Sequence, residues 1–401
     1  MKIFIHLLLL FTFLQSREPS PIPLPKTEIL SRSSYECSEL CLKRYLEKGD
    51  IFSFLSYSKD ILDDPELEEK RRFFQTLLNI SRSIDGAFVK IALIIPDKKI
   101  HTYSLSVAKS TFAYLLAREI PFQIENYYID DEKNATIRES VKKVENDGFS
   151  FVIAPFTEDG AKILADLKTD LYFYIPTINS KKIESSNQHL LFGGIDYESQ
   201  IDELINYLDG NDSISIFYDD SPKGEELENL VVSSLEKIGN RVAIKRSERV
   251  KKDDSNFNRF FSKRNFRNRY FLNTPRLKSA LILSQMTVND ETPSVVLSTQ
   301  INYSPTILSM TQFVDRRNLL IANSISSRIN RDVLNTNSIL QNDIKYDWIN
   351  YSTTVGIDYL FSLITGQKRL FQELLIKNQI IYNVRIMKPQ EARFVEVKKK
   401  N

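Results

Sequence analysis

The side chains that could perform acid–base or nucleophilic chemistry are few and scattered in this sequence. Its histidines are His6, His101 and His189, and neither of the later two lies next to a G-x-S-x-G nucleophile turn. Adjacent carboxylates occur at 130–131 and 219–220, directly after predicted strands, where solvated loop charges are the simpler interpretation. The residues therefore predict a protein without catalytic activity.

Sequence patterns for cofactors and metals are also missing. The chain has neither a GxxxxGK[ST] phosphate loop nor a G-x-G-x-x-G turn, and it contains only 11 glycines. Histidine, cysteine and carboxylate residues are not spaced as metal ligands. We therefore expect no cofactor and no bound metal.

The two cysteines, Cys37 and Cys41, are four residues apart, a spacing that places both on one face of a helix. In an oxidising compartment they could form a disulfide, although such a bond within one helix is strained. Two buried thiols are the alternative, and the sequence leaves both states open.

Polar side chains gather where several predicted strands end. If those strands are parallel, their carboxyl ends meet at one edge of a sheet, where hydroxyl and amide groups can bind a small polar ligand. The alternative is that these residues are turn and cap residues beside an empty cleft. The candidate ligand-binding residues are Thr157, Thr177, Asn179, Asn273, Thr274, Thr299 and Asn302.

The segment 245–278 is the most unevenly charged part of a chain whose formal net charge is only +2. That small net charge argues against nucleic acid as a partner, so an acidic protein or an anionic membrane surface is the expected partner of this segment. Alternatively, residues 256–264 form an amphipathic helix with inward phenylalanines and a solvated basic face. The candidate interaction patch is Arg259, Arg264, Arg267 and Arg269.

The N-terminal residues have the pattern of an exported protein. Lys2 precedes a short apolar run, so residues 1–16 are predicted to be a signal peptide that directs the chain to the periplasm, with an uncleaved membrane anchor as the alternative. Alternating prolines predict a linker over 17–32. Helical spacing of apolar residues predicts a helical segment over 33–84, with one helix opening at Asp64-Pro65.

From residue 89 onward, short apolar strands alternate with amphipathic helices. This rhythm predicts an α/β fold with parallel sheets that are covered on both faces. The predicted strands are 89–95, 122–128, 149–154, 172–175, 190–195, 213–218, 242–245, 270–272, 295–297, 319–322, 380–385 and 394–397. The predicted helices are 104–119, 134–147, 159–170, 198–208, 224–238, 276–287 and 348–365.

Several segments resemble the type I periplasmic-binding-protein fold, in particular its branched-chain-amino-acid receptors. They are KIALIIP, LFGG, SISIFYDD, NLLIANS and INYSTTVGIDYLFSLITG. The resemblance implies a two-lobed module over 88–401 with parallel sheets, preceded by the small helical segment. It places the first lobe at about 88–194 and 323–378, and the second lobe at about 195–322 and 379–401.

The layout of signal, helical segment and two lobes is also similar to that of envelope activators of penicillin-binding proteins. The chain departs from those proteins because it lacks a lipobox and has a shorter helical segment. The main expectation is a non-enzymatic periplasmic scaffold or regulator that contacts an envelope protein partner. The alternative is a receptor that binds amino acids or another small polar ligand for a transporter or a sensor. A cleft filled by the chain's own side chains would favour the scaffold.

Overall fold

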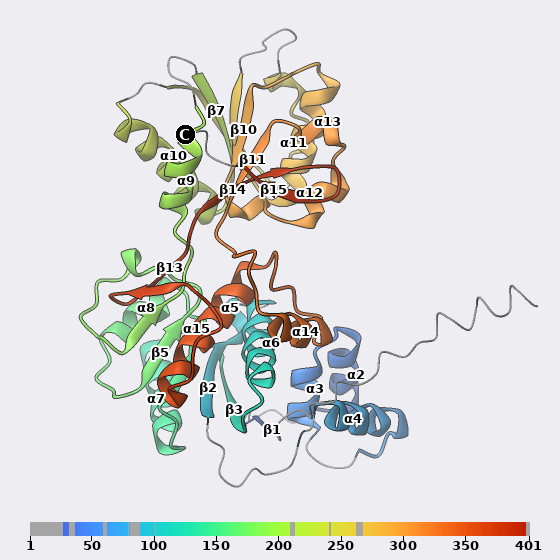
Figure 1. Cartoon of the computed structure of the whole chain (residues 1–401), viewed down its shortest axis with the longest axis vertical. Helices are drawn as coiled ribbons and strands as arrows, with labels where there is room; N and C mark the ends of the chain where they lie inside the picture. Colours follow the sequence, from blue (N-terminus) through green and yellow to red (C-terminus); the bar gives the residue numbers. More distant parts are fainter. Residues whose placement is uncertain are drawn as a thin grey trace, which may run out of the picture.

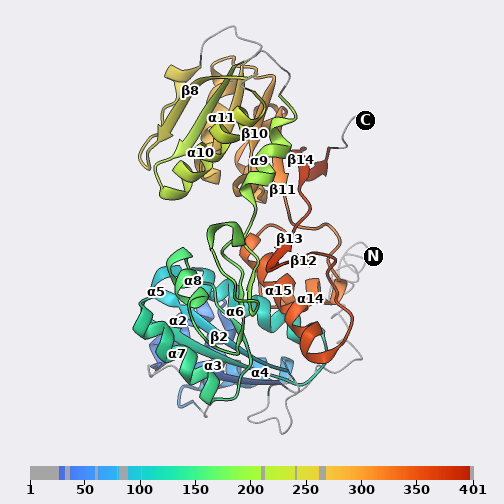
Figure 2. The same ribbon diagram turned by 90° about the vertical axis from the view of Figure 1, so that its left-hand side faces the viewer.

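The structure is a computed structural model, and it describes residues 27–31, 37–58, 62–78, 80, 89–100, 102–208, 213–239, 242–261 and 268–397. The predicted signal peptide lies outside these residues, as do His101, Arg264 and Arg267. Two lobes follow one another along the long axis of the molecule and are joined by thin connections (Figures 1 and 2). Within the described ranges, no helix combines the length and the apolar character needed to cross a bilayer.

The first lobe is built on a mostly parallel sheet with the order β1-β3-β2-β4-β5-β6-β13-β12. Its neighbouring strands run parallel except for β12 and β13, which form an antiparallel pair. The strands are β1 (Thr27–Ser31), β2 (Val89–Pro96), β3 (Phe122–Ile129), β4 (Phe151–Ile153), β5 (Tyr172–Ile175), β6 (Leu190–Phe192), β12 (Leu374–Ile376) and β13 (Gln379–Ile381).

Helices cover both faces of this sheet, as its nearly continuous apolar strands require. One face packs against α6 (Thr102–Ala117), which follows the short α5 (Asp97–Ile100), and against α15 (Trp348–Thr365). Helix α14 (Arg331–Ile339) lies beside α6. The other face packs against α7 (Asn134–Asn146) and α8 (Glu158–Ala165). The lobe therefore has a separate hydrophobic core on each side of its sheet.

The second lobe repeats this plan with the strand order β15-β14-β11-β10-β9-β7-β8. Helices α9 (Tyr197–Ile205) and α10 (Pro222–Lys237) cover one face. Helices α11 (Arg276–Val288) and α12 (Pro305–Met310) cover the other, and α13 (Phe313–Arg316) packs against α11. The strands are β7 (Ser213–Asp219), β8 (Ala243–Val250), β9 (Arg269–Asn273), β10 (Val295–Ser298), β11 (Leu319–Asn323), β14 (Arg385–Pro389) and β15 (Phe394–Glu396).

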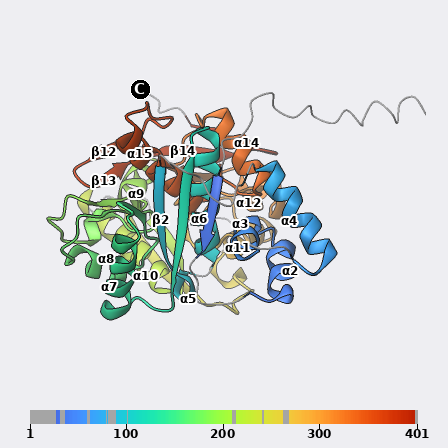
Figure 3. The same cartoon turned by 90° about the horizontal axis from the view of Figure 1, so that it is seen from below.

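The N-terminal helices pack directly onto the first lobe, beside α6 and the edge strand β1 (Figures 1 and 3). They are α2 (Glu39–Glu47), α3 (Ile51–Tyr57) and α4 (Pro65–Leu77), and Asp64 caps α4 by accepting hydrogen bonds from the backbone of Glu66 and Leu67. The ring of Phe52 meets that of Phe112 of α6 edge to face, with centroids 5.7 Å apart. These helices therefore share the core of the first lobe.

Part of the predicted linker, 17–32, belongs to the sheet. Strand β1 pairs in parallel with β3, in a register that places Ile29 opposite Ile124. As a strand, this segment forms backbone hydrogen bonds with the sheet that an extended linker would form with water. In addition, Ile29 is buried in the same hydrophobic core as α3. The prolines of the segment precede this strand and lie outside the described residues.

The chain crosses between the lobes after β6, after β11 and after β13. The first crossing requires glycine, because a Cβ on Gly194 would lie 2.1 Å from the backbone carbon of Ile178. The predicted strand 380–385 is wrong, since residues 382–384 separate β13 of the first sheet from β14 of the second. A segment that passes from one sheet to another has to leave the first ladder before it enters the next.

Candidate functional site

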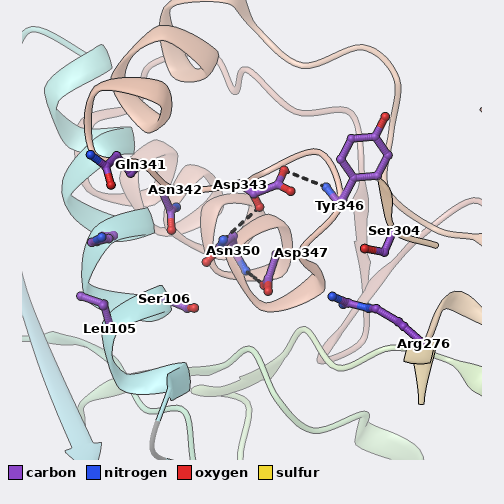
Figure 4. Close-up of a pocket in the computed structure, with 11 residues that line it drawn as sticks. Leu105, Ser106, Arg276, Ser304, Gln341, Asn342, Asp343, Tyr346, Asp347 and Asn350 are labelled. Atoms are coloured by element: carbon purple, nitrogen blue, oxygen red, sulfur yellow. Dashed lines mark hydrogen bonds between the residues drawn. The ribbon is translucent and has the colours of Figure 1, made fainter. Parts of the chain in front are cut away.

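A cavity of about 270 Å³ lies between the two lobes, and both lobes contribute to its walls. Helix α6 and the segment that joins α14 to α15 form the first-lobe wall, while Arg276 and Ser304 come from the second lobe. Figure 4 shows Arg276 extending toward Asp347, with Ser106 on the opposite wall. The lining residues are Leu105, Ser106, Lys109, Arg276, Ser304, Gln341, Asn342, Asp343, Tyr346, Asp347 and Asn350.

Buried amides hold the first-lobe wall together. Asn342 donates from Nδ2 to Ser110 Oγ at 2.9 Å and to Asn337 Oδ1 at 2.7 Å. Asn350 donates from Nδ2 to the backbone oxygen of Asp343 at 2.9 Å. These bonds tie α6, α14 and α15 into one unit, so the wall is organised before any ligand arrives.

The carboxylates of Asp343 and Asp347 stand at the start of α15. Asp347 caps this helix by accepting a 3.0 Å hydrogen bond from the backbone of Asn350, and Asp343 accepts from the backbone of Lys345 and Tyr346. Burial raises the pKa of the Asp347 carboxyl above its ordinary value, while the Asn350 backbone and the charge on Arg276 offset part of that rise. The pair offers negative charge to a ligand ammonium.

Two cationic side chains also line the cavity. Arg276 is the first residue of α11, is exposed, and donates from Nε to the backbone oxygen of Ile301 at 3.3 Å. Lys109 lies on α6 and is buried. The cavity therefore presents charges of both signs, which suits a small polar solute.

Contacts between the lobes border the cavity. The ring of Tyr346, a lining residue from the first lobe, lies 5.3 Å from that of Tyr303 and 6.1 Å from that of Phe394 in the second lobe. At another point of the interface, Lys182 Nζ of the first lobe lies 2.7 Å from Glu226 Oε1 of α10. The lobes are thus in contact around a cavity that their side chains leave open.

The strand-end residues predicted in the first lobe serve as internal supports. Thr157 donates to the Glu132 carboxylate, and Thr177 donates from Oγ1 to the backbone oxygen of Phe156 at 2.5 Å. Asn179 donates from Nδ2 to the backbone oxygen of Gly194 at 3.2 Å and so supports the first crossing. None of these residues lines the cavity between the lobes, and their role in ligand binding stays a prediction.

The strand-end residues of the second lobe are gathered and fully buried. Asn302 donates from Nδ2 to Ser298 Oγ and Ser279 Oγ, both at 2.8 Å, and Ser279 shares a 2.7 Å hydrogen bond with Thr274. Asn273 and Thr299 are also buried, and their side chains have no hydrogen-bond partner among the described residues. This set lies beneath the surface, so its predicted role as a ligand site also stays untested.

Of the predicted basic patch, the structure describes Arg259 and Arg269, and these two do not share a surface. Arg269 is buried in β9, a central strand of the second sheet, whereas Arg259 is exposed with its guanidinium 4.6 Å from the ring centre of Phe260. Within 256–261 the chain forms only a short 3-10 helix, Asn258–Phe260, instead of the start of an amphipathic helix. A strand position places Arg269 inside the sheet, away from any common surface with Arg259.

The remaining chemical candidates have structural roles. Cys37 and Cys41 form a disulfide next to the N-cap of α2, which is one of the two states that the sequence left open. The ring of His189 lies 4.2 Å from that of Tyr172. Among the residues that the structure describes, no group of three or more histidine, cysteine or carboxylate residues could hold a metal ion.

A second cavity of about 590 Å³ lies beside the third crossing, between α9, α10 and residues 382–384. Its walls come from the second lobe and the crossing segment, so a ligand there would not be held between the lobes. We therefore regard the cavity between the lobes as the better candidate site.

Sequence reasoning missed most of the lining of the candidate site. The lining residues Lys109, Asp343 and Asp347 were not among the predicted ligand-binding residues. The polar run NDIKYD directly before the long helix, at 342–347, was the available signal. An aspartate directly before a helix is expected to be an N-cap, and this role alone explains its presence in the sequence. Only the tertiary structure shows that it also lines a cavity.

No protein-family model matches the chain, and no curated protein sequence matches it. Solved structures do match. A branched-chain amino acid ABC transporter from Thermus thermophilus with bound valine has a TM-score of 0.57 at 12% identity, covering 78% of this chain and 95% of its own.

Two further structures agree with this match. A branched-chain amino acid transporter substrate-binding protein from Streptococcus pneumoniae, in complex with isoleucine, has a TM-score of 0.53 at 10% identity. It covers 77% of this chain and 99% of its own. An ABC transporter solute-binding protein from R. palustris, in complex with 4-hydroxybenzoate, has a TM-score of 0.52 at 10% identity and covers 78% and 96%.

These neighbours correct the main functional expectation. A scaffold or regulator was predicted, but the similar structures are substrate-binding proteins with small molecules bound, and the cavity between the lobes is open. The resemblance to activators of penicillin-binding proteins gains no support from them. The chain has the two-lobed α/β fold of type I periplasmic binding proteins.

Proposed function

We propose that this protein is a receptor that binds a small polar solute, such as an amino acid, between its two lobes. The observation that supports this proposal most directly is the cavity of about 270 Å³, to which both lobes contribute charged side chains. A solute held there contacts Ser106 and Asp347 on one side and Arg276 on the other, so that binding links the two lobes. Similar folds with bound valine, isoleucine and 4-hydroxybenzoate support the same reading.

The size and lining of the cavity indicate the class of solute. A volume of about 270 Å³ lies just below the usual range for ligand pockets, roughly 300–1,000 Å³, so the solute should be small. Carboxylates at Asp343 and Asp347 suit an ammonium group, and the hydroxyl groups of Ser106 and Ser304 can donate or accept hydrogen bonds. As in the neighbouring solute-binding proteins, delivery of the solute to a transporter in the periplasm is the corresponding cellular role.

A thermal-shift screen tests the proposal. Purified protein is heated with each free L-amino acid and with small carboxylic acids that include 4-hydroxybenzoate. A solute that binds only the folded chain should raise the midpoint temperature of unfolding in a saturable manner, because binding stabilises the native state. The absence of a shift with every solute would contradict the proposal.

A variant that fills the cavity provides the matched control. Ser106→Trp places a large ring on the α6 wall, whereas Ser233→Trp adds the same ring to an exposed position of α10, away from the cavity. We expect Ser106→Trp to abolish the shift and Ser233→Trp to retain it. Equal shifts in the two variants would place the solute elsewhere.

A further inference from the structure

Lys109 differs from the other charged lining residues because its side chain is almost completely buried, with only 5% of its surface exposed. Within the described residues, no hydrogen bond or salt bridge to its ammonium is found. A largely buried ammonium without a hydrogen-bond partner is costly, so such groups are normally paired. The side chain nevertheless lines the cavity, which is where a partner could reach it.

An acidic residue outside the cavity lining, Asp50, acts electrostatically on Lys109. Asp50, at the turn between α2 and α3, is itself buried and is occupied as the N-cap of α3, accepting a 2.9 Å hydrogen bond from the Ser53 backbone. Burial lowers the pKa of Lys109, and the charge on Asp50 offsets part of that effect. Asp50 and Lys109 do not form a salt bridge within the described residues, so the ammonium keeps its hydrogen-bonding capacity for the cavity.

The N-terminal helices also support the wall next to Lys109. Gly49, in the turn before Asp50, packs so closely on Gln341 that a Cβ there would lie 2.8 Å from Gln341 Oε1. Gln341 lines the same cavity. The turn at 49–50 thus contacts one lining residue and acts electrostatically on another.

Because Lys109 and Arg276 line the same cavity from opposite lobes, we infer that they hold an anionic group of the solute, a carboxylate or a phosphate, between the two lobes. This inference rests on the proposed function and adds to it the chemical group that the protein recognises. Lys109 supplies a positive charge from the first lobe, and Arg276 supplies a planar donor from the second. Asp50 acts as a positioning residue behind Lys109.

The anion site can be tested without knowing the solute. The unfolding midpoint of the full chain is measured at pH 7 against sodium acetate and against sodium phosphate, each compared with sodium chloride at equal ionic strength. We expect a saturable stabilisation by at least one of the two anions beyond that of chloride. A response to acetate alone identifies a carboxylate site, and a response to phosphate alone identifies a phosphate site. Chloride-like behaviour of both anions overturns the inference.

Variants assign the response to residues. Lys109→Met keeps the length of the side chain without its charge and should weaken the anion response at least about tenfold, as expected for a hydrogen bond to a charged group. Lys142→Met, at an exposed lysine of α7, should respond like the wild type. Arg276→Gln changes an exposed residue, so its fold should be intact, and it should weaken the response several-fold. If Lys109→Met folds and its response to the anion is unchanged, the inference is overturned. If Lys109→Met does not fold, an unchanged response in Arg276→Gln overturns it instead.

The two proposals can fail separately. If a solute from the thermal-shift screen binds Lys109→Met as tightly as it binds the wild type, the receptor function stands and the anion site is wrong. If no solute binds, yet an anion stabilises the wild type and not Lys109→Met, the anion site stands and the proposed receptor function is wrong.

Discussion

The carboxyl group of Asp347 is the residue on which recognition of an ammonium should depend. Asp347→Asn keeps the ability to cap α15, because asparagine is an equally good N-cap, but it removes the charge. We expect it to weaken binding of an amino acid by about 10- to 100-fold, the equivalent of about 1.5–3 kcal/mol for a hydrogen bond to a charged group. Calorimetric titration measures this effect. Asp332→Asn, at an exposed position of α14, should not change the affinity.

The pH dependence of binding follows from the same group. The ionised carboxylate binds an ammonium, and burial raises the pKa of Asp347 above 3.8. As the solution is acidified, the affinity for the solute should therefore begin to fall at a higher pH than it would if Asp347 had the pKa of an ordinary aspartate. Titrations between pH 7 and pH 4 test this expectation, and an affinity that stays constant over this range would contradict a role for Asp347 in binding.

In the N-terminal helices, Glu68 is the residue whose charge should make the stability of the fold depend on pH. Its carboxylate accepts hydrogen bonds from Arg71 Nε and Nη2, both at 2.5 Å, and from Arg72 Nε at 2.7 Å. The bonds from Arg71 hold the pKa of Glu68 well below its ordinary value of 4.5. Because the folded-state pKa is the lower one, this stabilisation is present above about pH 4.5 and is lost as the pH falls further.

Replacing Glu68 with glutamine should therefore lower the urea midpoint at pH 7. The difference between Glu68→Gln and the wild type should shrink as the pH is lowered below 4.5, since the wild type loses the same charge. Glu69→Gln, at the exposed neighbouring position, is the control and should unfold like the wild type. A difference that is independent of pH would mean that the charge of Glu68 is not the cause.

At the scale of elements, α3 anchors the N-terminal helices to the first lobe. Phe52 is fully buried against Phe112, so Phe52→Ala should lower the free energy of unfolding by about 3–5 kcal/mol. Phe73→Ala, on an exposed part of α4, should change it by less than about 0.5 kcal/mol. Chemical denaturation followed by circular dichroism provides the measurement. Similar effects of the two substitutions would mean that the contact between Phe52 and Phe112 does not anchor the N-terminal helices to the lobe.

Elements with strong local signals could be predicted from the sequence, and elements that depend on tertiary contacts could not. Strand β5 and helix α15 have their predicted bounds, because β5 is entirely apolar or aromatic and α15 begins after an N-cap aspartate and ends at Gly366 in the left-handed conformation. Strand β1 was missed because its only visible signal was the preceding run of prolines. Its pairing with β3 depends on a partner some 95 residues away.

The site was harder to predict than the fold for the same reason. The order of strands and helices along the chain can be predicted from the sequence, because each type of element has its own hydrophobic periodicity. Lys109, Arg276 and Asp347 come from three distant parts of the chain, and only the packing of two lobes brings them around one cavity. A lysine on an amphipathic helix predicts an exposed charge, so the burial of Lys109 could not be expected from its local sequence.

At the scale of the whole molecule, the first crossing sets how the lobes are joined. Gly194→Ala would force a Cβ against the Ile178 backbone, whereas Gly148→Ala meets open space and has only the strain of a positive φ. We expect Gly194→Ala to reduce stability by about 1–3 kcal/mol or more, as overpacking does, and Gly148→Ala by about 1 kcal/mol. Equal losses in thermal denaturation would mean that the crossing adapts without strain.

A crystal structure of the protein with a solute from the thermal-shift screen is the most direct test of the receptor proposal. We predict that the solute lies between Ser106 and Asp347 of the first lobe and Arg276 of the second, within the cavity of about 270 Å³. Its anionic group should face Lys109. A solute bound on the outer surface, or in the cavity beside the third crossing, would contradict the account.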